Sequence, residues 1–129
     1  MQLKDKVIVV TGALGGLGKA IVEASGIAEA KVIAIDRVTN TAPNGVAAAM
    51  TFDLTDPKAT LDGLAAIAAS QGRIDGLVNI AGGFRSETVS QGSVDTWDFL
   101  YHLNVRTAVK MRVAPHYRSF PHRAVVLST

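Results

Sequence analysis

The sequence predicts an α/β protein: a doubly wound parallel sheet with helices on both faces, in three layers. Short apolar segments rich in β-branched residues alternate along the chain with longer segments of helical period. A glycine-rich stretch connects the first such strand to the first helix. Strands that alternate with helices favour right-handed crossovers, and therefore a parallel sheet covered on both faces. No linker or internal repeat divides the sequence, so residues 1–129 are expected to form one domain.

Five short apolar runs are expected to form the strands of this sheet. The first is the run KVIVVT, which has the β-branched composition of a strand buried on both faces. The third run is the weakest of the five. The expected strands cover residues 6–11, 32–35, 49–52, 74–80 and 124–127.

Three helices are expected between these strands. The first follows the glycine-rich stretch and ends near Gly26. The second begins at Asp56-Pro57 and ends at Gly72, and the third begins after Ser93 as N-cap. The apolar stripes expected to face the core are Leu17, Ala20, Ile21 and Ala24 in the first helix, Leu61, Leu64, Ala65 and Ala68 in the second, and Trp97, Leu100, Tyr101, Val105, Ala108 and Met111 in the third.

The composition excludes several classes of protein. The chain has no cysteine, which rules out disulfides, thiolate metal sites and a cysteine nucleophile. No apolar run approaches the ~20 residues that cross a bilayer, and the N-terminus lacks the pattern of a signal peptide. The three histidines have no metal-ligand spacing. A soluble, cytoplasmic protein without a metal site or a membrane partner is therefore expected.

The charge is unevenly distributed. Residues 1–98 carry eight Lys/Arg against eleven Asp/Glu, whereas residues 99–129 carry five Lys/Arg and no acid. These basic residues do not form a dense run, and aromatic residues are not regularly interleaved with them. We interpret the segment as a solvated helix face followed by a basic loop, and expect no nucleic-acid partner.

The glycine-rich stretch predicts a binding site for a dinucleotide. Gly12, Gly16 and Gly18 form a G-x-x-x-G-x-G array between a strand and a helix. Such glycines permit a tight turn, close approach of the backbone to a pyrophosphate, and close packing of helix on strand. The helix N-terminus then offers free N–H groups to an anion. Asp36 ends the next strand 18 residues after Gly18, near the spacing of a ribose-binding carboxylate.

Two other nucleotide-binding motifs can be weighed against this interpretation. A P-loop is excluded because Ala20 follows Lys19, where a magnesium-binding hydroxyl is required, and because the glycine spacing differs. A methyltransferase dependent on S-adenosylmethionine also uses a glycine-rich first turn and an acid after the second strand. That alternative stays open on these residues alone.

Four motifs, in this order along the chain, carry a resemblance to a known family. They are TGALGGLG at Thr11–Gly18, Asp53-Leu54, the sequence NIAG at Asn79–Gly82, and Asn104 in the third expected helix. From about Lys6 onward the chain resembles the classical branch of the short-chain dehydrogenase/reductase family. It departs from the family's NNAG motif at Ile80, which replaces the second asparagine.

The resemblance implies a Rossmann-like fold and assigns roles to individual residues. Asn104 matches the asparagine of the family's catalytic tetrad. Ser128 and Thr129 align with the paired serines that end the fifth strand, and by that register Thr129 occupies the catalytic serine position. The residues that the resemblance and the motif analysis assign to the cofactor are Gly12, Leu14, Gly15, Gly16, Leu17, Gly18, Asp36, Arg37, Asp53, Leu54, Asn79, Ala81 and Gly82.

The resemblance implies an NAD(P)-dependent oxidoreductase that interconverts alcohols and carbonyls by hydride transfer. The family's catalytic Tyr-x-x-x-Lys pair does not occur here, since Pro121 stands four residues after Tyr117. We therefore expect a C-terminally truncated portion of the family fold, with an incomplete sheet. The alternative is a catalytically silent NAD-binding module that acts through a partner. In the family the helix that bears Trp97 packs against a second subunit, so a homo-oligomer through this helix is expected.

The residues after the second strand predict the choice of cofactor. A carboxylate at Asp36 accepts hydrogen bonds from both ribose hydroxyls of NAD(H) but repels the phosphate of NADP(H). Arg37 could pair with that phosphate. Relatives that favour the phosphate also place a basic residue before the middle glycine, where this chain has Gly15. NAD is therefore expected to be preferred over NADP.

Overall fold

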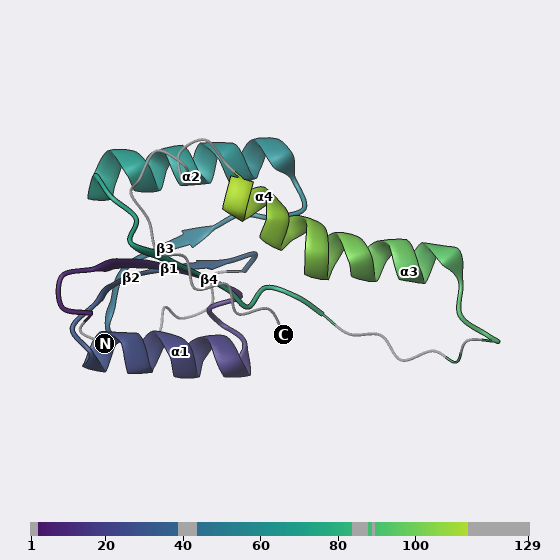
Figure 1. Ribbon diagram of the computed structural model, residues 1–129, viewed down its shortest axis with the longest axis horizontal. Helices are drawn as coiled ribbons and strands as arrows, with labels where there is room; N and C mark the ends of the chain where they lie inside the picture. The colour runs from purple at the N-terminus through teal and green to yellow at the C-terminus, as the bar shows by residue number, and fades with distance from the viewer. Residues whose placement is uncertain (1–2, 39–43, 84–87, 89, 114–129) are drawn as a thin grey trace.

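The computed structural model describes residues 3–38, 44–83, 88 and 90–113. Four strands form a parallel sheet in the order β3-β2-β1-β4 (Figure 1). The fold class predicted from the sequence is confirmed, and the third strand begins earlier than expected. The strands are β1 (Val7–Thr11), β2 (Lys31–Asp36), β3 (Val46–Thr51) and β4 (Gly76–Asn79).

Helices cover both faces of this sheet, in three layers. Helix α1 (Gly16–Ile27) lies on one face, and helix α2 (Pro57–Gln71) lies on the other beside α4 (Thr107–Val113) (Figure 1). Helix α3 (Val94–Tyr101) leads through a π-helical turn, η1 (His102–Arg106), into α4. Figure 1 shows α3 extending past the edge of the sheet, so that no strand of the described residues lies beneath it.

The core consists of two apolar clusters, one on each face of the sheet. Alternate residues of β1 supply both clusters: Val7 and Val9 face α2 and α4, whereas Ile8 and Val10 face α1. Burial on both faces explains why the strands are continuous apolar runs rather than alternating patterns.

The ends of α2 lie where the sequence predicts them. Asp56 is the N-cap, and its carboxylate accepts hydrogen bonds from the backbone N–H groups of Lys58 and Ala59. Pro57 occupies the first helical position. Gly72 ends the helix in the left-handed conformation, with φ of 71°.

The predicted core faces of α1 and α2 need correction. In α1 the buried residues are Gly18, Val22 and Ser25, while Leu17 is exposed. Gly18 sets this face, because its Cα hydrogens lie against the backbone of the turn and bring α1 close to the sheet. The rest of the predicted α1 stripe was Ala20 and Ala24, which are exposed, and Ile21, which is half-buried. In α2 the buried residues are Thr60, Gly63, Leu64 and Ile67, and Leu61 is exposed.

The predicted core stripe of the third helix is wrong at three of its six residues, while Leu100 and Ala108 are half-buried. Trp97 is 67% exposed and Tyr101 58% exposed, and Val105 is also exposed. These residues were predicted to face the core, but α3 extends beyond the sheet and η1 continues it. Near the C-terminal end of this helix Met111 is fully buried in the core beside the residues of α2.

The remaining predictions concern the fifth strand, membrane spans and metal sites. The expected strand at 124–127 lies outside the described residues. Within the described part of the chain, no helix is long and apolar enough to span a membrane. Among those same residues, no group of three or more histidines and acids could hold a metal ion.

Candidate functional site

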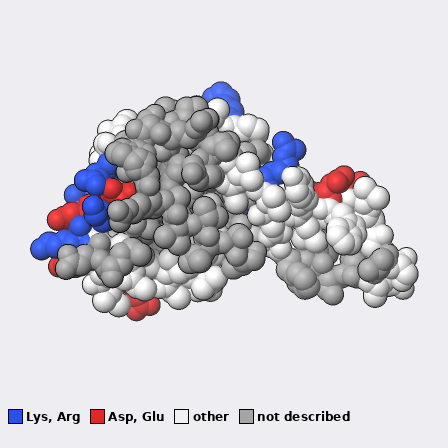
Figure 2. Space-filling view, in the orientation of Figure 1, with Lys and Arg blue, Asp and Glu red and all other residues white. Residues whose placement is uncertain are grey.

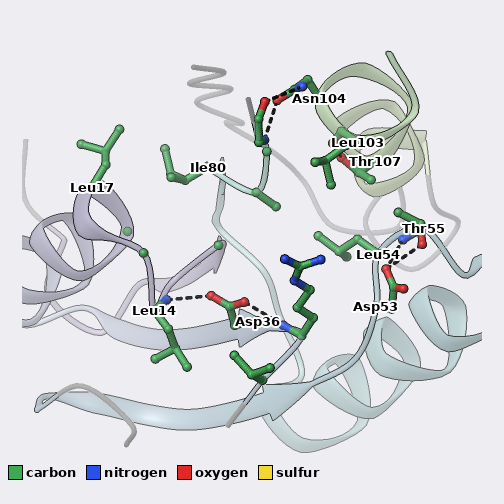
Figure 3. Close-up of a pocket in the computed structure, with 18 of the residues that line it drawn as sticks. Leu14, Leu17, Asp36, Asp53, Leu54, Thr55, Ile80, Leu103, Asn104 and Thr107 are labelled. Atoms are coloured by element: carbon green, nitrogen blue, oxygen red, sulfur yellow. Dashed lines mark hydrogen bonds between the residues drawn. The ribbon is translucent and has the colours of Figure 1, made fainter. Parts of the chain in front are cut away.

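A cavity of about 910 Å³ opens at the carboxyl ends of the strands (Figure 3). The turn after β1, the start of α1, the ends of β2 and β3, the loop after β4 and residues of α3, η1 and α4 line it. β1 lies between β2 and β4, so the crossover connections leave it in opposite directions along the sheet. Ligands of doubly wound sheets bind in the crevice at such a point.

The turn after β1 requires glycine at two of its positions. Gly12 has φ of +66°, and a Cβ there would lie 2.7 Å from the backbone nitrogen of Ala81. A Cβ on Gly18 would collide with the carbonyl oxygen of Gly12. The turn therefore packs tightly against the loop after β4, and α1 packs tightly against the turn.

The N–H groups of this turn fall into two sets. Those of Ala13, Leu14 and Gly15 donate to protein acceptors: the carbonyl of Ile35 at 3.2 Å, the carboxylate of Asp36 at 2.9 Å and the carbonyl of Gly12 at 3.2 Å. The N–H groups of the first turn of α1, which begins at Gly16, have no acceptor within the helix. The N-cap Gly15 supplies no side-chain acceptor either.

The space around the start of α1 fits a phosphate group. A Cβ on Gly16 would meet no atom within 4 Å, so the backbone faces the open cavity. Free N–H groups and the positive end of the helix dipole favour an anion at this place. The residues present therefore fit the pyrophosphate of a dinucleotide.

Asp36 lies beside this turn at the end of β2 (Figure 3). Its Oδ2 accepts the N–H of Leu14 at 2.9 Å, and its Oδ1 accepts the N–H of Arg37 at 2.8 Å. Both Asp36 and Arg37 line the cavity. The two groups predicted to decide between ribose hydroxyls and a ribose phosphate are thus neighbours at one wall of the site.

A second carboxylate, Asp53, lies farther along the same cavity (Figure 3). Its Oδ1 accepts the hydroxyl of Thr55 at 2.7 Å and the backbone N–H of Thr55 at 2.8 Å. These bonds lower the pKa of Asp53, and the positive charge of Arg37 adds to the effect. Asp53 is therefore an ionised hydrogen-bond acceptor at neutral pH.

Asn104 lies in η1 and connects it to the loop after β4. Its Oδ1 accepts the N–H of Gly83 at 3.0 Å, and its Nδ2 donates to the carbonyls of Gly83 at 3.0 Å and Leu100 at 2.9 Å. A Cβ on Gly82 would collide with Oδ1 of Asn104. The amide was predicted to point toward the core. Instead it is bound to backbone atoms at the rim of the cavity.

The structure brings twelve of the thirteen predicted cofactor residues to this cavity, together with Asn104. Asn79 is the exception: it is 4% exposed on β4, and its Nδ2 has no hydrogen-bond partner among the described residues. Ser128 and Thr129 lie outside the described residues. Sequence reasoning left out several residues that line the cavity: Val38, Phe52, Thr55, Ile80, Phe99, Leu103 and Thr107.

The sequence spacing of some of these residues could have identified them as part of the site. Thr55 follows Asp53 by two residues, a spacing at which a hydroxyl and an N–H can both reach the carboxylate. Leu103 and Thr107 precede and follow Asn104 at positions −1 and +3, near one face of the helix. Phe99 and Val38 carried no such signal.

Comparison with known proteins identifies the family. A family model described as short chain dehydrogenase matches residues 6–118. The meso-2,3-butanediol dehydrogenase of Serratia marcescens is 34% identical over 104 residues, which cover 75% of this chain and 41% of that protein. The 3-oxoacyl-acyl-carrier-protein reductase of Escherichia coli is 30% identical over 124 residues, which cover 88% of this chain and 49% of that protein. This chain thus spans less than half the length of these two relatives.

Solved structures of dehydrogenases and reductases share the fold of this chain. The ligand-free aldohexose dehydrogenase of Thermoplasma acidophilum aligns over 98% of this chain and 50% of its own, with a TM-score of 0.84 and 26% identity. An NADH-dependent reductase complexed with NAD aligns over 91% of this chain and 54% of its own, with a TM-score of 0.80 and 25% identity. The methyltransferase alternative is thereby removed. Because the family match covers most of its sequence, the chain belongs to the short-chain dehydrogenase/reductase family.

Proposed function

We propose that this chain is the NAD(H)-binding part of an oxidoreductase that interconverts an alcohol and a carbonyl. One observation carries the proposal. The open N-terminus of α1, the glycine-rich turn and the carboxylate of Asp36 line the same cavity, as recognition of a pyrophosphate and a ribose requires. The reductase that is similar to this chain and complexed with NAD supports the choice of ligand class.

Each group of residues has a separate part in this proposal. The N–H groups that begin at Gly16 bind the pyrophosphate, Asp36 accepts the adenosine ribose hydroxyls, and Asp53 accepts the adenine amino group. Leu17 and the loop at Ala81–Gly82 line the part of the cavity left for the nicotinamide. The cofactor supplies or accepts a hydride when it is bound.

The catalytic residues are proposed from the family resemblance. Asn104 holds Gly83 in place at the edge of the cavity. Ser128 and Thr129 are proposed to hydrogen-bond the substrate oxygen. The sequence contains no Tyr-x-x-x-Lys pair, and that pair supplies the proton to this oxygen in the family. The second candidate is therefore a catalytically silent NAD-binding module that acts through a partner.

NADH and NADPH distinguish the roles of Asp36 and Arg37. A ribose phosphate would place like charges in contact at Asp36, at a cost of several kcal/mol, so NADH is expected to bind at least ~100-fold more tightly. Fluorescence titration of both reduced cofactors measures this ratio, and Asp36→Ala should reduce it. Equal binding of both cofactors to the parent chain would show that Arg37 decides the choice.

The same samples separate an active enzyme from a silent module. Mixed with a panel of ketones, aldehydes and quinones, the chain is expected to bind NADH without oxidising it above background. Turnover that disappears in Asn104→Ala would instead support catalysis by this chain. Failure of the parent to bind either cofactor would contradict both candidates.

Two further properties are proposed. The exposed residues Val94, Trp97 and Tyr101 lie along one side of α3, and we propose that a second copy of the chain covers them. In Figure 2 most of the charged side chains on the visible face lie at the opposite end of the molecule, while one acidic cluster lies at this end. A cytoplasmic location is proposed from the family.

A further inference from the structure

The ladder between β1 and β2 continues past the end of β1, along the last residues of β2. Its last paired residues are Thr11 and Ile35. Beyond them the N–H of Ala13 still donates to the carbonyl of Ile35 at 3.2 Å. The next N–H, that of Leu14, donates at 2.9 Å to Oδ2 of Asp36 (Figure 3). A side-chain carboxylate thus extends the ladder one residue into the glycine-rich turn.

This hydrogen bond joins segments that are distant in sequence. Leu14 and Asp36 are 22 residues apart, whereas the bond from Oδ1 of Asp36 to the N–H of Arg37 is local. The carboxylate is therefore held between the turn and the end of β2. Its orientation is fixed by two backbone donors before any ligand arrives.

The carboxylate retains capacity for a ligand. Two carboxylate oxygens accept about four hydrogen bonds, and two are occupied by the N–H groups of Leu14 and Arg37. The remaining capacity matches two ribose hydroxyls. Ligand recognition and support of the turn can therefore occur at the same time.

We propose that Asp36 is a positioning residue for the glycine-rich turn as well as a contact of the ribose. By holding Leu14, it fixes the path of the turn that leads to the N–H groups at Gly16–Gly18, where the pyrophosphate binds. The proposal rests on the proposed NAD(H) site. It implies that cofactor preference and the shape of the turn cannot be changed independently at this position.

A ligand without the ribose hydroxyls separates the two roles. The analogue of NADH with a 2′,3′-dideoxy adenosine ribose cannot donate to Asp36, so a residue that acts only on the ribose would not affect its binding. We expect Asp36→Ala to weaken binding of this analogue by about tenfold, because the turn loses a charge-assisted hydrogen bond. Unchanged affinity for the analogue would overturn the proposal.

Asp53→Ala is the matched control. It removes another carboxylate from the same cavity, but Asp53 makes its hydrogen bonds to Thr55 and not to the turn. Asp53→Ala should weaken NADH and the dideoxy analogue by the same factor. An effect of Asp53→Ala confined to NADH would contradict the assignment of the ribose to Asp36.

The hydrogen bond from the N–H of Leu14 to the Asp36 carboxylate, here called the anchor, can be tested without any ligand by amide hydrogen exchange. In Asp36→Ala the N–H of Leu14 should exchange at least ~10-fold faster, while the N–H groups of Val9 and Val10 in β1 keep their protection. Asp53→Ala should leave Leu14 unchanged. If Asp36→Ala does not fold, the shape-conserving Asp36→Asn replaces it, with the same expected direction. Equal exchange at Leu14 in parent and variant would overturn the anchor.

These two measurements also separate this proposal from the proposed function. If the parent binds neither NADH nor its analogue, the NAD(H) assignment fails, but faster exchange at Leu14 would still establish the anchor. If the parent binds both ligands and Asp36→Ala affects only NADH, the assignment stands and the anchor is refuted.

Discussion

Gly16 and Gly18 stand two residues apart, yet the structure gives their missing side chains different consequences. A Cβ on Gly18 would collide with the carbonyl oxygen of Gly12, so this glycine is required by the fold. A Cβ on Gly16 would meet no atom within 4 Å, so the fold itself does not require glycine at this position. The sequence motif alone does not make this distinction.

The distinction predicts opposite results for two valine variants. Gly16→Val should fold with a melting temperature near that of the parent but lose NADH binding, because its side chain fills the space of the pyrophosphate. Gly18→Val should lose about 1–3 kcal/mol of stability, because overpacking displaces α1 from the turn. Thermal unfolding and calorimetric titration with NADH measure both. NADH binding by Gly16→Val as tight as in the parent would contradict the location of the pyrophosphate.

The start of β1 depends on a carboxylate from outside the strand. Oδ2 of Asp75 accepts the N–H of Val7 at 2.8 Å, and the N–H of Asp75 donates to the carbonyl of Val7 at 2.8 Å. Burial acts to raise the pKa of Asp75, but the hydrogen bonds from Arg73 and Val7 outweigh it, and the pKa is lowered. The charged form therefore stabilises the pairing of β1 with the segment that leads into β4.

The lowered pKa gives this contribution a defined pH dependence. It is fully present above the unfolded pKa of about 3.9 and is lost as the pH falls through the lower folded value. Asp75→Asn should therefore cost about 1 kcal/mol at pH 7, and the difference from the parent should shrink below about pH 4. Urea unfolding across this range measures it. A difference that persists undiminished in acid would show that the charge is not responsible.

Which elements could be predicted depended on how local their causes are. The strands and the caps of α2 follow from adjacent residues: continuous β-branched runs, Asp56 before Pro57, and Gly72 after the last turn. The buried face of α1 could not be predicted, because it is set by contact of Gly18 with a turn six residues earlier. Ser25 is buried on that face but adds no apolar signal.

In the candidate site, too, only the residues marked by local sequence patterns could be predicted. Gly12 and Asp36 were predicted because motif spacing reports on backbone turns and strand ends, and Asp53 was predicted from the family resemblance. Phe99 and Val38 line the cavity through three-dimensional packing, and no spacing marks them. The bond between Leu14 and Asp36 was missed for a similar reason: a carboxylate that replaces a backbone carbonyl appears only when both strands are in register.

The arrangement of α3 beyond the sheet leaves an apolar surface that the described part of the chain does not cover. Val94, Trp97, Tyr101, Val105 and Val109 are exposed at spacings of three or four residues, so they lie along one side of the helix. Figures 1 and 2 place this helix at the end of the molecule away from most charged side chains of the visible face. A row of exposed apolar side chains of this kind favours contact with another protein surface.

Self-association through this surface is therefore expected. In sedimentation velocity the parent should shift from an associated species to monomer on dilution, and Tyr101→Lys should remain monomeric, because a charge in an apolar contact must be desolvated. Ile27→Lys is the matched control, since Ile27 is 78% exposed on α1, far along the chain from this stripe. Trp97 is the single tryptophan, so its emission should shift to longer wavelength on dilution of the parent but not of Tyr101→Lys. A parent that is monomeric at every concentration, with emission independent of dilution, would refute association through α3.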